Sequence, residues 1–238
     1  MPGSETLNQR LHEISGGTVL DIATGKGDFA ARMAENLRDY DHILGIDLQH
    51  DRLVQAVAKH DYANLSFVRM DASRIALADR SVDTLAMAYS FHHMDDVAPT
   101  FREIKRVTRP GAAIMFVECY RYDDRDQPIG VQLHHWWAAI DRRAGVTHND
   151  TWTRAEILER VNQLNLSDMT VFDIDLVQDE LDSAEEREQI ERVFDEYPHR
   201  IAGHPDYERL KEEGERLRQA LREQGLSWSP DVVIIGRR

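Results

Sequence analysis

Short apolar runs alternate with longer amphipathic segments along this 238-residue chain. Strands that are apolar throughout and separated by helices are typical of a mostly parallel sheet covered on both faces. The apolar runs predict strands at 18–22, 43–47, 66–70, 83–88, 112–118, 169–177 and 231–236. The segments between them predict helices at 28–39, 51–60, 97–108 and 153–164. We therefore predict an α/β fold.

Two sequence patterns mark helix ends. Thr153-Arg-Ala-Glu156 is a capping-box pattern with Thr153 as the N-cap residue. Pro110-Gly111 is expected to stop the preceding helix, at about residue 108.

A Gly-x-Gly turn follows the first predicted strand, in the segment Val19-Leu-Asp-Ile-Ala-Thr-Gly-Lys-Gly-Asp-Phe-Ala30. Gly25 and Gly27 can adopt left-handed backbone angles, and without a Cβ they let a ligand lie against the main chain. The helix that follows points its free N–H groups at that ligand. The spacing also satisfies a dinucleotide fingerprint. Asp21 distinguishes S-adenosylmethionine from a dinucleotide such as NAD, because a carboxylate suits a ligand with an ammonium group and would repel a pyrophosphate. S-adenosylmethionine is therefore favoured over NAD.

The chain resembles the class I S-adenosylmethionine-dependent methyltransferases, and is similar to the ubiquinone/menaquinone biosynthesis group that acts on small molecules. The resemblance runs from about Gly17 to Leu166. Its segments, in the family's order, are Asp21 to Gly27, Ile43-Leu-Gly-Ile-Asp47, Phe67-Val-Arg-Met-Asp71-Ala, Val82 to His93, and Arg109 to Glu118. Departures are Lys26 and a long helical segment near the C-terminus.

The resemblance implies a single methyltransferase domain, 1–238, with a Rossmann-like seven-stranded sheet whose last strand is antiparallel. In the family the last two strands form a hairpin, so residues 178–228 are expected to be a helical insertion, divided into two helices by Pro198, Gly203 and Pro205. Its apolar stripes must be buried in a lid over the active site, against a second subunit or on the outer face of the sheet. We favour a lid or a homodimer. The stripes are Ile190, Val193, Phe194 and Tyr197, then Leu210, Leu217 and Leu221.

The candidate cofactor-binding residues all lie at the carboxyl ends of predicted strands, where open α/β sheets bind ligands. Asp47 can accept both ribose hydroxyls or cap the next helix. Asp71 and Ala72 take the family's adenine position, with a plain turn aspartate as the alternative. Tyr89 and Ser90 should face the methionine part, and Lys26 points to the ligand carboxylate or to solvent. The predicted set is Asp21, Ala23, Thr24, Gly25, Gly27, Asp47, Leu48, Asp71, Ala72, Tyr89 and Ser90.

Methyl transfer from a sulfonium mainly requires alignment and exclusion of water, and a base is needed only if the acceptor must lose a proton. His92 and His93 lie close to where the methyl group should be, and they are our candidate catalytic residues, with packing as the alternative role. The string His92 to Asp96 also suggests a metal site. Adjacent loop residues seldom converge on one ion, so we predict no metal.

Residues 120–150 correspond to the segment that covers the acceptor side in the family. Gln132 to Ile140 predicts a helix with Leu133, Trp136, Trp137 and Ile140 on one face, which is either core or acceptor pocket. That placement leaves His134 and His135 partly exposed. Further candidates for the acceptor pocket are Glu118, Tyr120 and His148. We expect Cys119 to be a buried thiol rather than a nucleophile.

Composition narrows the function. The net charge of −14 disfavours nucleic-acid and membrane partners. The segment Ala88-Tyr-Ser-Phe91 also lacks the element with which nucleic-acid methyltransferases hold a flipped amino base. One cysteine and an N-terminus without signal-peptide features suggest a cytoplasmic location. We predict methyl transfer to oxygen, nitrogen or carbon of a small molecule. The alternatives are an NAD-dependent oxidoreductase and a non-catalytic cofactor-binding protein on the same fold.

Overall fold

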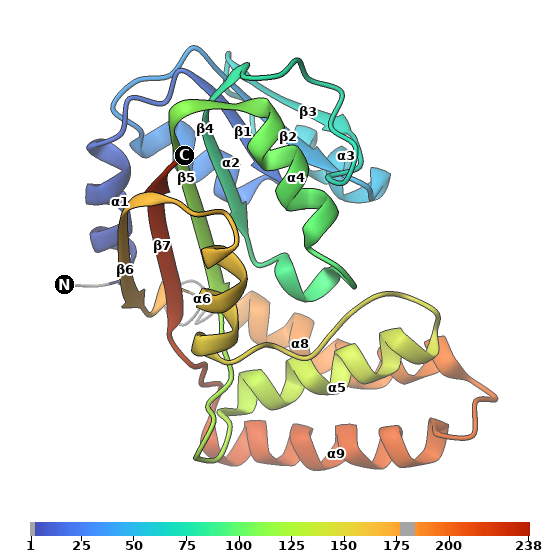
Figure 1. The fold of residues 1–238 in the computed structure, drawn as a ribbon. Helices are drawn as coiled ribbons and strands as arrows, with labels where there is room; N and C mark the ends of the chain where they lie inside the picture. Colours follow the sequence, from blue (N-terminus) through green and yellow to red (C-terminus); the bar gives the residue numbers. More distant parts are fainter. Residues whose placement is uncertain (1–2, 177–183) are drawn as a thin grey trace.

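A single seven-stranded sheet organises the chain in the computed structural model, which describes residues 3–176 and 184–238 (Figure 1). The strand order is β3-β2-β1-β4-β5-β7-β6. Neighbouring strands pair in parallel except at β7, which is antiparallel to both β5 and β6. The Rossmann-like fold with an antiparallel last strand is therefore confirmed. The strands are β1 Thr18–Ile22, β2 His42–Asp47, β3 Leu65–Arg69, β4 Val82–Ala88, β5 Thr108–Cys119, β6 Ser167–Ile174 and β7 Asp231–Arg237.

Helices cover both faces of this sheet. Apolar side chains of α4 and α6 share a core with one face, and those of α1 and α2 share a core with the other. The α-helices are α1 Gly3–His12, α2 Asp28–Asn36, α3 His50–Lys59, α4 Ala98–Val107, α5 Ile129–Arg143, α6 Arg154–Asn162, α8 Ala184–Glu196 and α9 Tyr207–Gln224. Two short 3-10 helices are η1 Phe91–His93 and η2 Tyr197–Ile201.

The predicted helix ends agree closely with the structure. At the start of α6 the amide of Glu156 donates to Thr153 Oγ1 at 3.2 Å, and the amide of Thr153 donates to Glu156 Oε2 at 2.8 Å. The capping box is therefore confirmed. Helix α4 ends at Val107, and Pro110-Gly111 lies within the long strand β5 rather than directly after the helix. The sequence analysis missed α1, whose Leu7 and Leu11 are fully buried.

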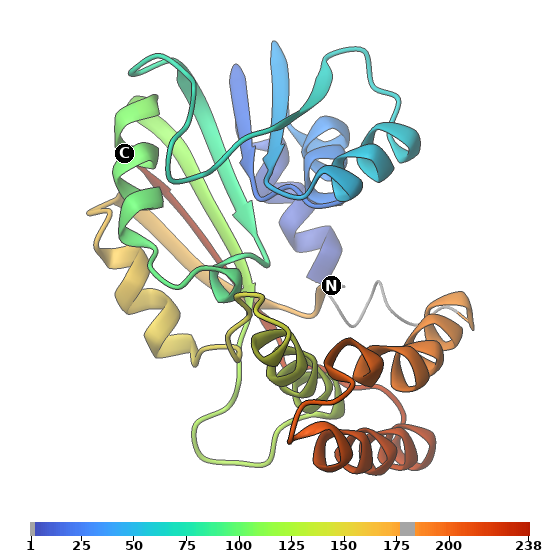
Figure 2. The ribbon, with the colours of Figure 1, turned by 90° about the vertical axis from the view of Figure 1, so that its right-hand side faces the viewer.

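The predicted insertion forms a separate helical layer with α5. Figures 1 and 2 show α5, α8 and α9 together beyond the carboxyl ends of β4 and β5. All seven residues of the two predicted stripes pack in one apolar cluster with Leu133, Trp136 and Ile140 of α5. The stripes are thus buried within the chain and away from the outer face of the sheet. Residue 177 of the predicted sixth strand and residues 178–183 of the insertion lie outside the described residues.

Trp136 lies at the centre of this layer. Its indole Nε1 donates to the carbonyl of Leu210 in α9 at 2.7 Å, and its ring contacts Phe194 of α8 with centroids 5.5 Å apart. A Cβ on Gly214 would lie 2.6 Å from Trp136 Cζ2, so glycine is what lets α9 approach α5. We call α5, α8, η2 and α9 the cap. Within residues 3–176 and 184–238, none of the helices is long and apolar enough to span a membrane.

Candidate functional site

The Gly-x-Gly turn has the backbone conformation that the sequence predicts. Gly25 has φ +57° and Gly27 has φ +82°, and Gly27 is the N-cap residue of α2. The amide of Gly25 donates to Asp47 Oδ2 at 2.9 Å, which ties the turn to the end of β2. Two non-glycine residues at strand ends, Ala23 and Tyr89, also have positive φ, at 54° and 50°. Such strained backbone concentrates at functional sites.

The two glycines serve different purposes. A Cβ on Gly27 would lie 2.6 Å from Phe67 Cζ, so its small size is required by packing alone. A Cβ on Gly25 would meet no heavy atom of the described residues closer than Arg52 Nη1, at 3.8 Å. The space next to Gly25 is therefore open, as close approach by a ligand requires.

Asp21 is the electrostatic centre of the site. Its side chain is 1% exposed, and Oδ2 accepts a hydrogen bond of 2.5 Å from Thr24 Oγ1. Burial raises the pKa of Asp21 to about 7; the hydrogen bond from Thr24 opposes this shift, and the nearby charge of Asp47 adds to it. A buried carboxylate of this kind is stabilised by a ligand that brings a positive charge.

The other predicted cofactor residues lie at the adjoining strand ends. Asp47 Oδ1 accepts from the amide of Gln49 at 2.8 Å, so this carboxylate also performs the turn role that the sequence left open. Leu48 is 57% exposed beside it. Asp71 Oδ1 accepts from the amide and hydroxyl of Ser73, both at 2.8 Å, so Asp71 does shape a turn, followed by Ala72. Both carboxylates keep lone pairs for a ligand.

Ser90 follows β4 and faces the same end of the sheet. Its side chain is 2% exposed, and Oγ has no hydrogen-bond partner among the described residues. Buried hydroxyls are usually hydrogen-bonded. This unpartnered oxygen beside Tyr89 is therefore a binding group suited to a polar ligand.

Arg52 in α3 is a candidate that the sequence analysis missed. Its guanidinium lies beside the open space at Gly25 and is near enough to His93 for its charge to act on that imidazole. Lys26, which was considered for the ligand carboxylate, is exposed. An Arg in the first turn of α3 gave no signal in the sequence, because its closeness to Gly25 depends on the pairing of β1 with β2.

Glu118, at the end of β5, holds the loop after β4 in place. Its Oε1 accepts from the amides of Ser90 and Phe91 at 2.6 and 2.8 Å, and Oε2 lies 3.4 Å from Nδ1 of His92. Glu118 is 2% exposed. Glu118 therefore positions the loop that carries Ser90 and His92. The neighbouring Cys119 is buried, as expected, and burial raises the pKa of its thiol well above the usual range.

We expect Glu118→Ala to reduce the free energy of unfolding by about 3 kcal/mol, because two buried N–H groups would lose a charged acceptor. Urea unfolding followed by circular dichroism measures this. Glu118→Gln is the matched control, since an amide oxygen still accepts from both amides and the loss should be smaller. Equal stability of Glu118→Ala and the wild-type protein would contradict this role.

The two candidate catalytic histidines have different environments. His92 is 6% exposed, whereas His93 reaches the surface. Although part of its ring is solvent-exposed, desolvation lowers the pKa of His93 to about 3, assisted by repulsion from His92 and His148. His93 is therefore neutral at physiological pH.

Helix α5 of the cap places imidazole side chains close to His92, which the sequence did not predict. His135 is half-buried as predicted, but the expectation that His134 is partly exposed was wrong: it is 7% exposed. Its ring contacts those of His92 and His148, each with centroids 4.7 Å apart. The sequence analysis placed His134 on the open side of α5, but the segments containing His92 and His148 cover that side. Tyr120, another candidate, is buried at the end of β5.

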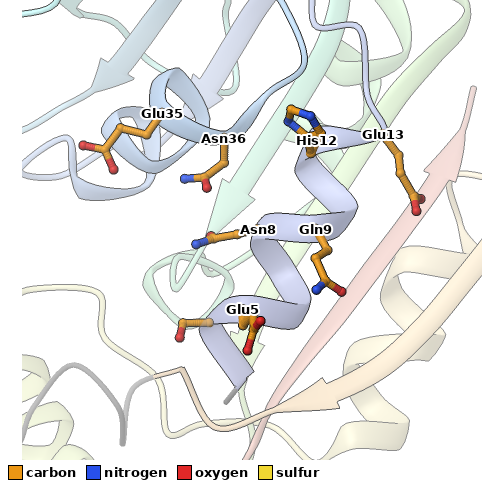
Figure 3. Close-up of a pocket in the computed structure, with 8 residues that line it drawn as sticks. Glu5, Asn8, Gln9, His12, Glu13, Glu35 and Asn36 are labelled. Atoms are coloured by element: carbon orange, nitrogen blue, oxygen red, sulfur yellow. The ribbon is translucent and has the colours of Figure 1, made fainter. Parts of the chain in front are cut away.

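A hollow of about 690 Å³ lies elsewhere, between α1 and the last turn of α2 (Figure 3). Polar and charged side chains line it, among them Asn8, His12 and Glu35. None of its lining residues comes from a strand end. The features of a cofactor site described above are therefore separate from this hollow.

Comparison with known proteins agrees with this geometry. Residues 19–111 match the family model described as "Methyltransferase domain", a range that includes the glycine turn and the ends of β1 to β4. These residues therefore match a methyltransferase domain, and the sheet order with its antiparallel β7 is that of the class I, S-adenosylmethionine-dependent methyltransferase fold. The family's cofactor is S-adenosylmethionine, and the open space beside Gly25 and the buried Asp21 fit it.

Particular relatives are more distant. The demethylmenaquinone methyltransferase of Chlorobaculum tepidum is 32% identical over 100 residues, 42% of this chain and 40% of that protein. Matches to the curated relatives span 40% to 56% of their length. Phosphoethanolamine N-methyltransferase 2 of Haemonchus contortus, solved with S-adenosyl-L-methionine, has a TM-score of 0.62 and 18% identity over 98% of this chain and 52% of that chain. The 4+2 cyclase SpnF has a TM-score of 0.59 and 16% identity over 98% of this chain and 82% of that chain.

Proposed function

We propose that this protein transfers the methyl group of S-adenosylmethionine to a small-molecule acceptor. The observation that carries the proposal is the meeting of a buried Asp21, whose pKa burial raises to about 7, with the open space beside Gly25 at the ends of β1 and β2. When bound there, the cofactor would supply an activated methyl group. The chain's own residues would bind it, orient it and exclude water.

Residues at the strand ends, together with Arg52 of α3, would each bind one part of the cofactor. Asp21 would bind the amino group and Arg52 the carboxylate, both through opposite charge. Asp47 would accept the ribose hydroxyls with the lone pairs that its backbone contacts leave. Leu48 and Ala72 would flank the adenine, with Asp71 accepting from its amino group. Ser90 and Tyr89 would border the methionine part.

A neutral His93 is a weak base, because efficient proton abstraction needs a pKa near the operating pH. We therefore propose that His93 lines the acceptor side without removing a proton, and that the acceptor reaches the site with a lone pair or carbanion already available. His92 is held against Glu118 beneath it.

The acceptor is proposed to enter between η1 and the cap. The family match ends at residue 111, before the segment 120–150, so this chain's own cap would determine which acceptor fits. The net charge of −14 favours a small molecule over a nucleic acid. The acidic charge and the buried Cys119 are in keeping with the proposed cytoplasmic location.

Isothermal titration with adenosylhomocysteine and with NAD tests the cofactor. We expect stoichiometric binding of adenosylhomocysteine and much weaker binding of NAD, because a pyrophosphate would be repelled by Asp21. Release of adenosylhomocysteine from S-adenosylmethionine, measured over a panel of phenols, quinols and amines, tests the activity. Equal affinity for NAD would contradict the cofactor assignment. Binding without release over the whole panel would favour the non-catalytic alternative.

The Gly25→Ala variant tests the position of the cofactor. We expect its affinity for adenosylhomocysteine to fall about tenfold, because a methyl group would enter space left to the ligand, at a cost of about 1.4 kcal/mol. Gly111→Ala is the matched control: Gly111 also has positive φ, at 82°, and its Cβ would meet nothing within 4 Å in the described residues. Both variants carry the same kind of backbone strain. An equal affinity for both would place the cofactor elsewhere.

A further inference from the structure

Three buried histidines from three separate segments meet next to the proposed methyl-transfer site. His92 comes from η1, His134 from α5 and His148 from the segment between α5 and α6. One ring nitrogen from each lies within 4.8 Å of the other two. The three side chains are 6%, 7% and 6% exposed, in that order. We propose that His92, His134 and His148 form a binding site for a divalent transition metal, with Zn²⁺ as the ion of best fit.

The spacing of the nitrogens suits a tetrahedral ion. His134 Nε2 and His148 Nε2 face each other at 3.1 Å. Two nitrogens bound at 2.0–2.1 Å to a tetrahedral zinc lie about 3.3 Å apart. These two nitrogens are therefore already at the separation that one ion requires, whereas the His92 nitrogen, which lies within 4.8 Å of both, would move closer on binding. Three histidines and a fourth, open position are the ligand set of catalytic zinc sites.

Carboxylates lie behind two of the three ligands. Asp141 Oδ2 is 2.7 Å from Nδ1 of His148, so the carboxylate accepts that N–H and leaves the Nε2 lone pair directed at His134. Glu118 Oε2 lies 3.4 Å from Nδ1 of His92. Metal-bound histidines commonly have such carboxylate partners, which fix the tautomer and make the ligand more basic.

The surrounding contacts preorganise the cluster. The amide of Asn149 donates to the carbonyl of His92 at 2.7 Å, and its side chain donates to the carbonyl of Met94 at 3.1 Å. Arg142 Nη1 donates to the carbonyl of His148 at 2.7 Å. The two bonds of Asn149 join the segment after α5 to η1 and Met94, and the bond of Arg142 joins that segment to α5. The ion would therefore connect the cap to the strand ends that form the cofactor site.

The surroundings of His134 and His93 also bear on the site. His134 Nδ1 is buried and has no hydrogen-bond partner within the described part of the chain. His93 reaches the surface with its ring centroid 4.3 Å from that of His92, and it marks a route of entry for the ion.

This arrangement differs from the metal site considered from the sequence. That site was a run of adjacent residues, His92 to Asp96. The three ligands here are far apart in the chain, at 92, 134 and 148, and they meet through the packing of the cap against η1. The objection to neighbouring ligands therefore does not apply.

Titration of the metal-free, full-length protein with zinc sulfate tests the proposal. We expect one equivalent of Zn²⁺ to bind. His134→Gln and His148→Gln should each weaken its affinity by more than about 100-fold, because the loss of a metal ligand costs more than the loss of a hydrogen-bond partner of a ligand. Asp141→Asn should weaken it by about 10- to 100-fold. His135→Gln is the matched control, because His135 is the next residue of α5 and contacts Thr151 Oγ1 at 2.8 Å, outside the cluster.

X-ray absorption of the wild-type protein with one equivalent of zinc gives a second readout that needs no variant. We expect three imidazole ligands. No stoichiometric binding, binding unaffected by His134→Gln and His148→Gln, or a spectrum with at most one imidazole would each overturn the site. Adenosylhomocysteine affinity, measured on the same zinc-free samples, is expected to persist. Failure of the metal site is thereby distinguished from failure of the proposed methyl transfer.

Discussion

Asp21→Asn will bind adenosylhomocysteine about 100-fold more weakly than the wild-type protein at pH 8, because loss of one partner of a buried charge pair costs roughly 2–5 kcal/mol. The side chain is almost fully buried, so water screens little of its attraction to the ligand's amino group. Asparagine keeps the shape and can still accept from Thr24. The lost affinity therefore reports the charge. Isothermal titration at pH 8 measures it.

The wild-type affinity should also depend on pH. With a pKa of about 7, Asp21 is mostly protonated at pH 6 and mostly ionised at pH 8. Since the ionised form binds the ammonium group, affinity should rise by about tenfold between these pH values. Asp21→Asn should lose that rise. A variant with the same pH dependence as the wild-type protein would assign the titration to another group.

Stability should change in the opposite direction. The pKa of Asp21 is raised in the folded protein, so its contribution to stability is fully present below the unfolded value of 3.8 and is lost as pH rises through about 7. At pH 8 the wild-type protein holds a buried, ionised carboxylate, which costs stability, and the asparagine variant lacks this cost. We expect its unfolding midpoint to equal or exceed that of the wild-type protein. A variant that is both less stable and weaker in binding would indicate misfolding instead of a lost charge pair.

The sheet and its strand ends could be predicted because local sequence determines them. Strands β1, β2 and β7 are largely runs of Val, Ile and Leu, and residues such as Asp21 and Asp47 lie near the points where these runs end. Parallel strands bring those ends to one edge. The hydrogen bond from the Gly25 amide to Asp47 follows from the same pairing of β1 with β2.

The cluster of histidines could not be predicted because it depends on tertiary contacts. The periodicity of α5 correctly grouped Leu133, Trp136 and Ile140, and it left His134 on the other side. Only the packing of η1 and of the segment after α5 against that side buries His134. Helix α1 was missed for a related reason: its first two residues, Gly3 and Ser4, have low helix propensity, and the sheet face buries Leu7 and Leu11.

Trp136→Ala is expected to lower the stability of the cap by about 3–5 kcal/mol, the usual cost of removing a large buried aromatic side chain. Besides the cavity, the carbonyl of Leu210 would lose its donor. Because this residue contacts α8 and α9 but belongs to a core separate from those of the sheet, the loss should concentrate in the cap. Hydrogen exchange followed by mass spectrometry should show faster exchange in α5, α8 and α9, with β1 to β4 unchanged.

Two companion variants separate the contributions. Trp136→Phe keeps an aromatic ring against Phe194 and removes the hydrogen bond, so its loss should be about 1 kcal/mol. Val146→Ala truncates an exposed side chain just after α5, and it should leave exchange in the cap unaltered. If the cap is a separate layer that covers the acceptor side, Trp136→Ala will keep its affinity for adenosylhomocysteine while methyl transfer falls. Uniformly faster exchange throughout the sheet would instead show that the cap is required for the fold of the cofactor site itself.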